Sequence, residues 1–241
     1  MNPLLIIAII ILVPVVLFLI FIGVPFIAGR FVNPNKLYEK GNAFYRGMYN
    51  VIVRIGLFFS RVKINYEGDA KVPSGRFLLI SNHRSNFDPL VTSAAMKKYK
   101  LAFISKKENL TMPVFGRVVR RICYMPLERD DPRDALKIIN HSAKLIQSNE
   151  CSVCVYPEGK RSFSNELLPF HAGVLKIAQK AGVPIVVATI EGTELIRDRF
   201  PKKTNVTLRI LDVVSAEEAH SKRSVELGEE LYNEMKQALG K

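Results

Sequence analysis

An uncharged stretch near the start of the chain restricts how these residues can fold. From Leu4 to Ala28 no residue carries a charge, and the first charged side chain is that of Arg30. A helix of about 20 apolar residues is long enough to cross the hydrocarbon core of a bilayer. The residues before the stretch, Met1 to Pro3, supply none of the basic side chains that open a secretory signal peptide. We therefore expect an uncleaved membrane helix.

A few residues bear on the geometry and orientation of this helix. Pro14, Gly23 and Pro25 interrupt it, so a kinked helix, or one lying partly in the interface, is the alternative to a spanning helix. Basic side chains follow it only on its carboxyl side, beginning at Arg30. Because basic residues beside a spanning helix stay in the cytoplasm, we expect the globular part to face the cytoplasm.

Residues 37–62 form a second candidate membrane element, an amphipathic helix. At about 100° per residue one face is apolar and the other carries arginines, whereas Val53 and Leu57 break the pattern. The apolar face comprises Leu37, Phe44, Tyr45, Met48, Val51, Ile52, Ile55, Phe58, Phe59 and Val62. Such a helix suits the headgroup region of a bilayer. It suits equally well a position on the globular domain, with its apolar face packed there.

After Lys63 the pattern changes to alternating strands and helices. The predicted strands are Phe77–Ser81, Leu101–Ser105, Ile122–Leu127, Ser152–Tyr156, Ile185–Ile190 and Val206–Leu211. The predicted helices are Pro89–Lys97, Pro132–Gln147, Gly173–Lys180 and Ser224–Leu239. This alternation indicates an α/β sheet with crossover helices, in which ligands gather at the carboxyl ends of the strands. We divide the chain into a membrane-binding element, residues 1–62, and a globular domain, residues 63–241.

The net charge of the chain, +13, lies entirely after residue 29. Such a domain is attracted to anionic lipid headgroups, to phosphorylated substrates or to nucleic acid. The predicted membrane helix favours lipid as the partner. A nucleic-acid binder would place aromatic side chains among its cations, and the sequence has no such platform, so we expect no nucleic-acid partner.

Two of the three cysteines form a Cys-x-x-Cys pair, Cys151 and Cys154. The run from Cys151 to Tyr156 has the pattern of a strand, in which residues three apart point to opposite faces of the sheet. No second pair or nearby histidine completes a zinc set. We therefore expect buried core thiols and no metal.

Chemistry is most strongly indicated by the stretch Ser81–Pro89. His83 follows a predicted buried strand, and Asp88 comes five residues later. An imidazole steadied by a carboxylate is a suitable general base for a hydroxyl, because its protonation changes near neutral pH. The alternative is a surface histidine beside a helix start, with Asp88 as N-cap and Pro89 at the first helical position.

Three further stretches place charges where predicted strands end. Tyr156–Ser162 brings a carboxylate, two cations and a hydroxyl beside a glycine, which suits a phosphate or oxyanion site. Its alternative is a charged surface turn. Ser105–Glu108 and Tyr124–Arg129 each place a cation just after an apolar run. Any one of the three alone is weak evidence, because basic residues after strands are usually solvated.

In this order the stretches resemble the four motifs of the glycerolipid acyltransferases. The motifs are His-x-x-x-x-Asp from His83, an apolar-Pro-apolar-acid-Arg run ending at Arg129, Pro-Glu-Gly-x-Arg-Ser at Pro157–Ser162, and Val183–Val186. The likeness is greatest to the bacterial 1-acyl-sn-glycerol-3-phosphate acyltransferases, which implies a location in a bacterial inner membrane. It implies a central mixed, largely parallel sheet flanked by helices, and an O-acyltransferase of phospholipid biosynthesis.

The resemblance also implies the reaction. A fatty acyl group would pass from a coenzyme A or acyl-carrier-protein thioester to the sn-2 hydroxyl of lysophosphatidic acid, giving phosphatidic acid. The thioester is a co-substrate, and no cofactor is implied. Because a thioester is already activated, the hydroxyl can attack it directly without a nucleophilic residue. Another lysophospholipid or lyso-aminolipid acceptor remains an alternative, as does a non-catalytic membrane tether.

Roles for individual residues come from the same resemblance. His83 would be the general base and Asp88 its orienting partner. The implied substrate-binding residues are Lys106, Arg129, Glu158, Gly159, Arg161 and Ser162. Arg161 and Lys106 would hold the substrate phosphate, Arg161 more strongly because a guanidinium binds phosphate in a bidentate manner. A backbone N–H near Gly159 would stabilise the oxyanion.

Two departures from the family pattern bear on this interpretation. Cys123 stands where the second motif often has glycine, and Lys160 stands where the third motif commonly has threonine. Neither touches the His83 and Asp88 pair. Lys160 adds a positive charge beside Arg161, so the headgroup of the acceptor is left open.

Overall fold

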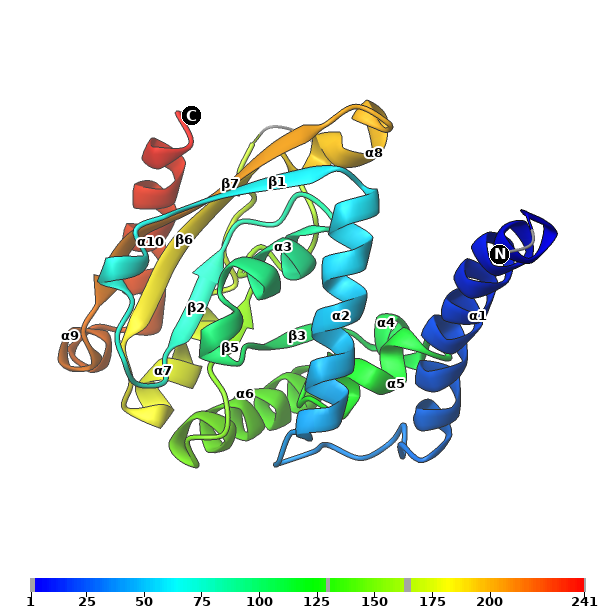
Figure 1. Cartoon of the computed structure of the whole chain (residues 1–241). Coiled ribbons are helices and arrows are strands. Elements are labelled where there is room, and N and C mark those ends of the chain that lie inside the picture. The colour runs from blue at the N-terminus through cyan, green and yellow to red at the C-terminus, as the bar shows by residue number, and fades with distance from the viewer. Residues whose placement is uncertain (1–2, 129–130, 163–165, 241) are drawn as a thin grey trace.

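The computed structural model describes residues 3–128, 131–162 and 166–240. Its first element is the long apolar helix α1 (Pro3–Arg30), which runs through Pro14 and Pro25. Figure 1 shows α1 projecting from the globular part, which it meets at α5 (Phe115–Arg120). The Arg117 guanidinium donates to the carbonyl of Gly29 over 3.0 Å and ties the end of α1 to the domain. In the described chain α1 alone is long and apolar enough to cross a membrane, and its apolar window is not buried.

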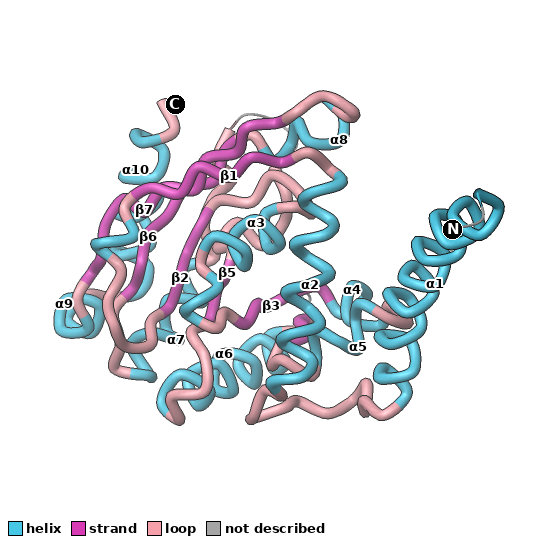
Figure 2. The backbone as a smooth tube through the Cα atoms, viewed as in Figure 1, coloured by secondary structure: helices cyan, strands magenta, loops and turns pink. Residues whose placement is uncertain are grey.

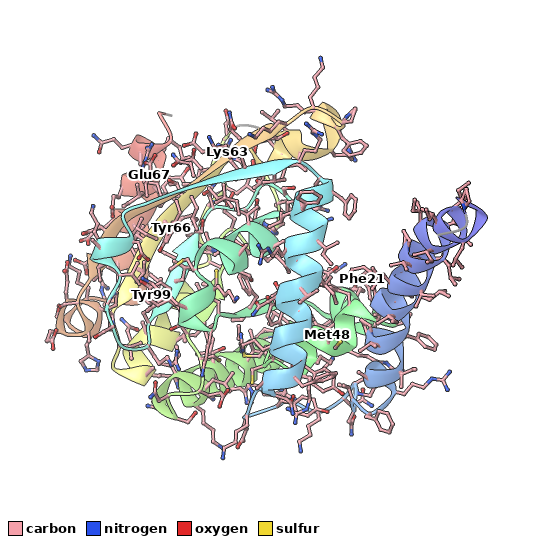
Figure 3. The ribbon with its side chains drawn as sticks, viewed as in Figure 1. Phe21, Met48, Lys63, Tyr66, Glu67 and Tyr99 are labelled. Carbon is pink, nitrogen blue, oxygen red and sulfur yellow. The ribbon has the colours of Figure 1, made fainter. Side chains whose placement is uncertain are left out.

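Helix α2 (Ala43–Phe59) packs on the globular domain through a stripe that its sequence pattern did not predict. Its buried side chains are Tyr45, Tyr49, Val53 and Leu57. Four residues of the predicted apolar face, Phe44, Val51, Phe58 and Phe59, are exposed, whereas Tyr45 is buried. Met48, which Figure 3 labels on this helix, is half-buried. Val53 and Leu57, which broke the predicted pattern, are therefore the residues that anchor the helix to the core.

Seven strands of the described chain form one sheet, in the order β1-β7-β6-β2-β5-β3-β4. The strands are β1 (Val62–Glu67), β2 (Leu78–Ser81), β3 (Ala102–Lys106), β4 (Met125–Leu127), β5 (Val153–Val155), β6 (Ile185–Glu191) and β7 (Thr204–Val214). Every neighbouring pair is parallel except β6 and β7. Figure 2 shows the strands side by side in one twisted layer. The predicted mixed, largely parallel sheet is confirmed.

The edge strand β1 was not predicted, because its residues were assigned partly to the preceding helix. Val62, Ile64 and Tyr66 alternate with more polar residues, the pattern of a strand with one buried face. Lys63 and Glu67 lie along this edge (Figure 3). Charged side chains on an edge strand disfavour pairing with a further strand.

Helices cover both faces of the sheet. Besides α1, α2 and α5 they are α3 (Asp88–Ala95), α4 (Lys107–Thr111), α6 (Pro132–Gln147), α7 (Lys176–Ala181), α8 (Ile196–Arg199), α9 (Ala216–Ser221) and α10 (Ser224–Ala238). Helices α2 and α3 lie on one face, and α6, α7 and α10 on the other (Figure 1). Helix α6 has the predicted bounds, and Gly182 ends α7 in the left-handed conformation at φ 67°.

The core is centred on β2, in which every residue is buried. Cys123, Cys151 and Cys154 are buried free thiols, which confirms the prediction of core cysteines. Cys123 adopts φ 73°, in the left-handed region that favours glycine. This conformation explains why a glycine is suited to that position of the second motif.

Candidate active site

The carboxyl ends of five parallel strands meet at one edge of the sheet. Strands β6, β2, β5, β3 and β4 are neighbours and run in the same direction. His83 follows β2, Glu158 follows β5, Lys106 ends β3, and Thr193 follows β6. The predicted gathering of motifs at this edge is therefore observed for the first and third motifs, which touch each other.

His83 and Asp88 form a hydrogen-bonded pair. The Nδ1 atom of His83 lies 2.7 Å from Oδ2 of Asp88. The Asp88 side chain is 0% exposed, whereas that of His83 is 16% exposed, so the ring reaches the surface while its partner does not. No described residue makes a hydrogen bond to Nε2 of His83. The pair thus presents one nitrogen of the ring to a substrate.

The surroundings of Asp88 fix the tautomer of His83. Oδ2 of Asp88 accepts the backbone N–H groups of Arg84 at 2.7 Å and Ser85 at 2.8 Å. Oδ1 accepts the hydroxyl of Thr193. A carboxylate that receives these donors acts as an acceptor toward the imidazole as well, so Nδ1 carries the proton and Nε2 holds the lone pair.

Asp88 does not act as the N-cap of α3, which the alternative interpretation required. Phe87 occupies the N-cap position, and Asp88 is the first residue of the helix, ahead of Pro89. Its carboxylate reaches backwards to the amides of Arg84 and Ser85 instead of forwards. The Asp88 side chain therefore serves the turn that carries His83.

Glu158 joins the third motif to the first. Its two carboxylate oxygens accept the backbone N–H of His83 at 2.6 Å and that of Leu168 at 2.9 Å. The Glu158 side chain is buried, and this burial raises the pKa of its carboxyl, although the two backbone donors oppose the rise. Ser162 adds a second link, because its backbone N–H donates to the carbonyl of His83 over 2.8 Å.

Gly159 adopts a conformation that explains why a glycine is present. Its φ is 67°, and a Cβ atom here would lie 2.9 Å from the His171 ring. Its N–H donates to the carbonyl of Tyr156 over 3.0 Å and closes a turn. The predicted oxyanion donor is a backbone N–H near Gly159, and the N–H of Gly159 itself is already used in this turn.

The predicted phosphate-binding cations differ in their surroundings. Arg161 is half-buried in the loop beside Ser162, close to the His83 backbone. Lys106 is exposed at the end of β3, where its ammonium lies 3.0 Å from the carboxylate of Glu108. Because β3 lies two strands away from β2, the backbone of Lys106 is about 10 Å from the strand that precedes His83. Arg129 lies outside the described residues.

Sequence reasoning missed two side chains that contact the pair. Thr193 hydrogen-bonds Asp88, and the Tyr156 ring stacks on His83 with centroids 4.3 Å apart and an angle of 12° between the planes. Thr193 follows a predicted strand, and that position at a carboxyl end was the one available signal. Tyr156 opens the stretch Tyr156–Ser162, which contains the third motif. No feature of the sequence around it indicated that its ring would lie against His83.

Comparisons with known proteins show similarity to acyltransferases. The model of a family described as Acyltransferase matches residues 63–191. The 1-acyl-sn-glycerol-3-phosphate acyltransferase of Haemophilus influenzae is 30% identical over 164 residues, 68% of this chain and 65% of that protein. The chloroplastic 1-acyl-sn-glycerol-3-phosphate acyltransferase BAT2 of Brassica napus is 35% identical over 133 residues, 54% of this chain and 38% of that protein.

A solved structure has the same fold. The 1-acyl-sn-glycerophosphate (LPA) acyltransferase PlsC of Thermotoga maritima aligns with a TM-score of 0.65 and 21% sequence identity, over 81% of this chain and 78% of that chain. The curated relatives are matched over less of their own length, about half or less for the first of them.

Proposed function

The chain belongs to the acyltransferase family, and from this premise we propose that it transfers a fatty acyl group from a thioester to the sn-2 hydroxyl of lysophosphatidic acid. The names of its relatives support this acceptor. The observation that carries the proposal is the pair of His83 and Asp88, with Nε2 of the imidazole available at the surface.

In the proposed reaction His83 acts as the general base. Nε2 takes the proton of the acceptor hydroxyl while the hydroxyl oxygen forms a bond to the thioester carbonyl carbon. The carbon–sulfur bond then breaks, and the proton passes from the imidazolium to the leaving thiolate. Asp88 stabilises the imidazolium through Nδ1. A positioned general base typically contributes about 10²–10⁴ to the rate.

Arg161 and Lys106 are the proposed phosphate ligands. Arg161 lies in the loop that is hydrogen-bonded to the His83 backbone, so a phosphate on its guanidinium would place the sn-2 hydroxyl of the glycerol near His83. Lys106, exposed and on a long flexible stem, would neutralise the second charge of the phosphate. The donor, either acyl coenzyme A or acyl carrier protein, would approach His83 at the edge of the sheet where the carboxyl ends of the strands meet.

Membrane placement completes the proposal. Helix α1 would span the bilayer, with Arg30 at its cytoplasmic end and the domain on that side. The exposed side chains of α2, including Phe58 and Phe59, would lie among the headgroups. Acceptor and product are both membrane lipids, so this placement keeps the site next to its substrate.

Transfer of a labelled palmitoyl group to lysophosphatidic acid in detergent micelles tests the function, with both donors supplied. We expect the wild-type chain to form phosphatidic acid and His83→Ala to lose all measurable turnover. His220→Ala is the matched control, because His220 is exposed on α9. Activity of His83→Ala near that of the wild type would refute the base assignment. Product from another lysolipid alone would replace the acceptor.

A further inference from the structure

The ring of Tyr156 covers one face of the His83 imidazole. The centroids are 4.3 Å apart, and the planes are nearly parallel at 12°. Tyr156 follows β5 and His83 follows β2, and these two strands are paired in parallel. The contact therefore joins the two stretches at the point where their strands end, and it lies on the face of the imidazole, whereas Asp88 contacts Nδ1 at the ring edge.

Tyr156 is itself held by the core. Phe103 on β3 lies 6.2 Å from it at 30°, and Tyr124 lies 5.2 Å from Phe103. The Tyr156 hydroxyl is buried near the Thr92 hydroxyl, but neither atom is in hydrogen-bonding geometry with a described residue. The ring contacts are thus the interactions by which this side chain acts on the site.

We propose that Tyr156 is a positioning residue, whose ring holds the imidazole of His83 in the plane that points Nε2 at the acceptor hydroxyl. The hydrogen bond to Asp88 restrains one ring nitrogen, but the ring can still tilt about that atom. A flat aromatic surface against the imidazole opposes this tilt. This inference rests on the proposed reaction.

The same stack favours the protonated ring that forms during transfer. The face of a phenol ring carries negative potential and attracts a cation held above it. Burial raises the pKa of the Tyr156 hydroxyl well above its ordinary value, so the ring stays neutral. A stacked imidazolium gains from this interaction, and its loss is expected to slow the reaction by about 2- to 30-fold.

Three substitutions separate this role from core packing. Tyr156→Leu removes the ring, whereas Tyr156→Phe keeps it and removes only a hydroxyl without a hydrogen bond among the described residues. Phe103→Leu is the matched control, because it removes a buried aromatic side chain that contacts Tyr156 but makes no ring contact with His83. Thermal unfolding of each full chain in detergent reports the loss of packing.

The kinetic test measures kcat and the KM for lysophosphatidic acid. We expect Tyr156→Leu to lower kcat about tenfold with little change in KM, and Tyr156→Phe to stay within about twofold of the wild type. A wild-type kcat in Tyr156→Leu would overturn the proposal. Equal losses in the Leu and Phe variants would overturn it as well, since the hydroxyl would then be the active group.

A second measurement does not depend on catalysis. The Nδ1–H proton of His83, bonded to Asp88, gives a far-downfield NMR resonance in the ¹⁵N-histidine-labelled chain, which a His83→Gln variant identifies. We expect it to be sharp in the wild type and in Tyr156→Phe, and to broaden or vanish in Tyr156→Leu. Equal broadening in Phe103→Leu would overturn the proposal. If the wild type transfers no acyl group, the proposed function fails while this resonance still tests the stack.

Discussion

Thr193 donates its hydroxyl to Oδ1 of Asp88, the carboxylate oxygen that His83 does not contact. The hydroxyl comes from the turn after β6, whereas Asp88 and His83 follow β2, and these strands are neighbours in the sheet. With the two backbone amides on Oδ2, this bond completes the set of donors around a fully buried carboxylate. The orientation of the pair thus depends on a residue more than 100 positions away.

Replacing Thr193 by valine should weaken both the fold and the proposed activity. Valine keeps the shape but leaves Oδ1 of Asp88 buried without its donor, which costs about 1–3 kcal/mol of unfolding free energy. We expect kcat to fall about tenfold, because the carboxylate then orients His83 less firmly. Urea unfolding and acyl transfer measure the two effects. Thr193→Ser, which retains the hydroxyl, should restore both, and an inactive serine variant would contradict this assignment.

Asp88→Asn should retain the fold and lose most of the activity. The amide oxygen can accept the bonds now made by Oδ2, and Thr193 can rotate its hydroxyl to accept from the amide nitrogen. The variant therefore removes the negative charge opposite the imidazolium with little other change. We expect kcat to fall about 100-fold with a small change in unfolding free energy. An effect on KM alone would show that Asp88 serves substrate binding.

Much of the fold could be predicted because strands and helices carry local patterns. Helix α6 matched its predicted bounds, since Asp131 caps it and Pro132 opens it. The prediction missed β1 and was incomplete at α2. The predicted helix ran to Val62, the first residue of β1, and the five residues after it were not assigned to a strand. The residues that α2 buries include Val53 and Leu57, which do not belong to its predicted apolar face.

The contacts in the site are of two kinds, those between residues close in the sequence and those between residues far apart in it. His83 and Asp88 are five residues apart, so a single turn brings them together and the sequence shows it. Tyr156 and Thr193 reach the pair from β5 and β6, and only the order of strands in the sheet makes them neighbours. Contacts that depend on strand order cannot be read from spacing along the chain.

The buried carboxyl of Glu158 should make stability depend on pH. Burial raises its pKa in the folded chain above the unfolded value, so the folded state binds the proton more tightly. The resulting stabilisation is present below the unfolded pKa, about 4.3, and is lost as pH rises through the folded pKa. Glu158→Gln should therefore lose less unfolding free energy than the wild type as the pH rises above the unfolded pKa.

A half-buried glutamate, Glu67, provides a control of opposite sign. The hydrogen bond from Arg209 lowers the pKa of Glu67, so its stabilisation is present above the unfolded pKa and is lost as pH falls. Glu67→Gln should flatten the acidic side of the stability curve. Urea unfolding at several pH values measures both slopes. Unchanged slopes in Glu158→Gln would mean that this carboxyl titrates as it does in the unfolded chain.

The exposed face of α2 should bind membranes even without α1. Phe58 and Phe59 are 74% and 69% exposed, and they lie opposite the stripe that α2 buries in the core. Removing residues 1–62 would delete that buried stripe together with the membrane helix, so removal of residues 1–27 is the cleaner experiment. We expect this shortened chain still to sediment with anionic vesicles, because each phenylalanine that leaves water contributes about 1.5–3 kcal/mol.

Replacing both Phe58 and Phe59 by serine in the shortened chain should lower its partition coefficient at least tenfold. Val225 is an exposed apolar residue on α10, across the sheet, so Val225→Ser should leave the partition coefficient unchanged. If the double variant bound as well as the shortened parent, the basic surface and not α2 would be the part that binds the membrane. Raising the salt concentration should then release the chain from the vesicles.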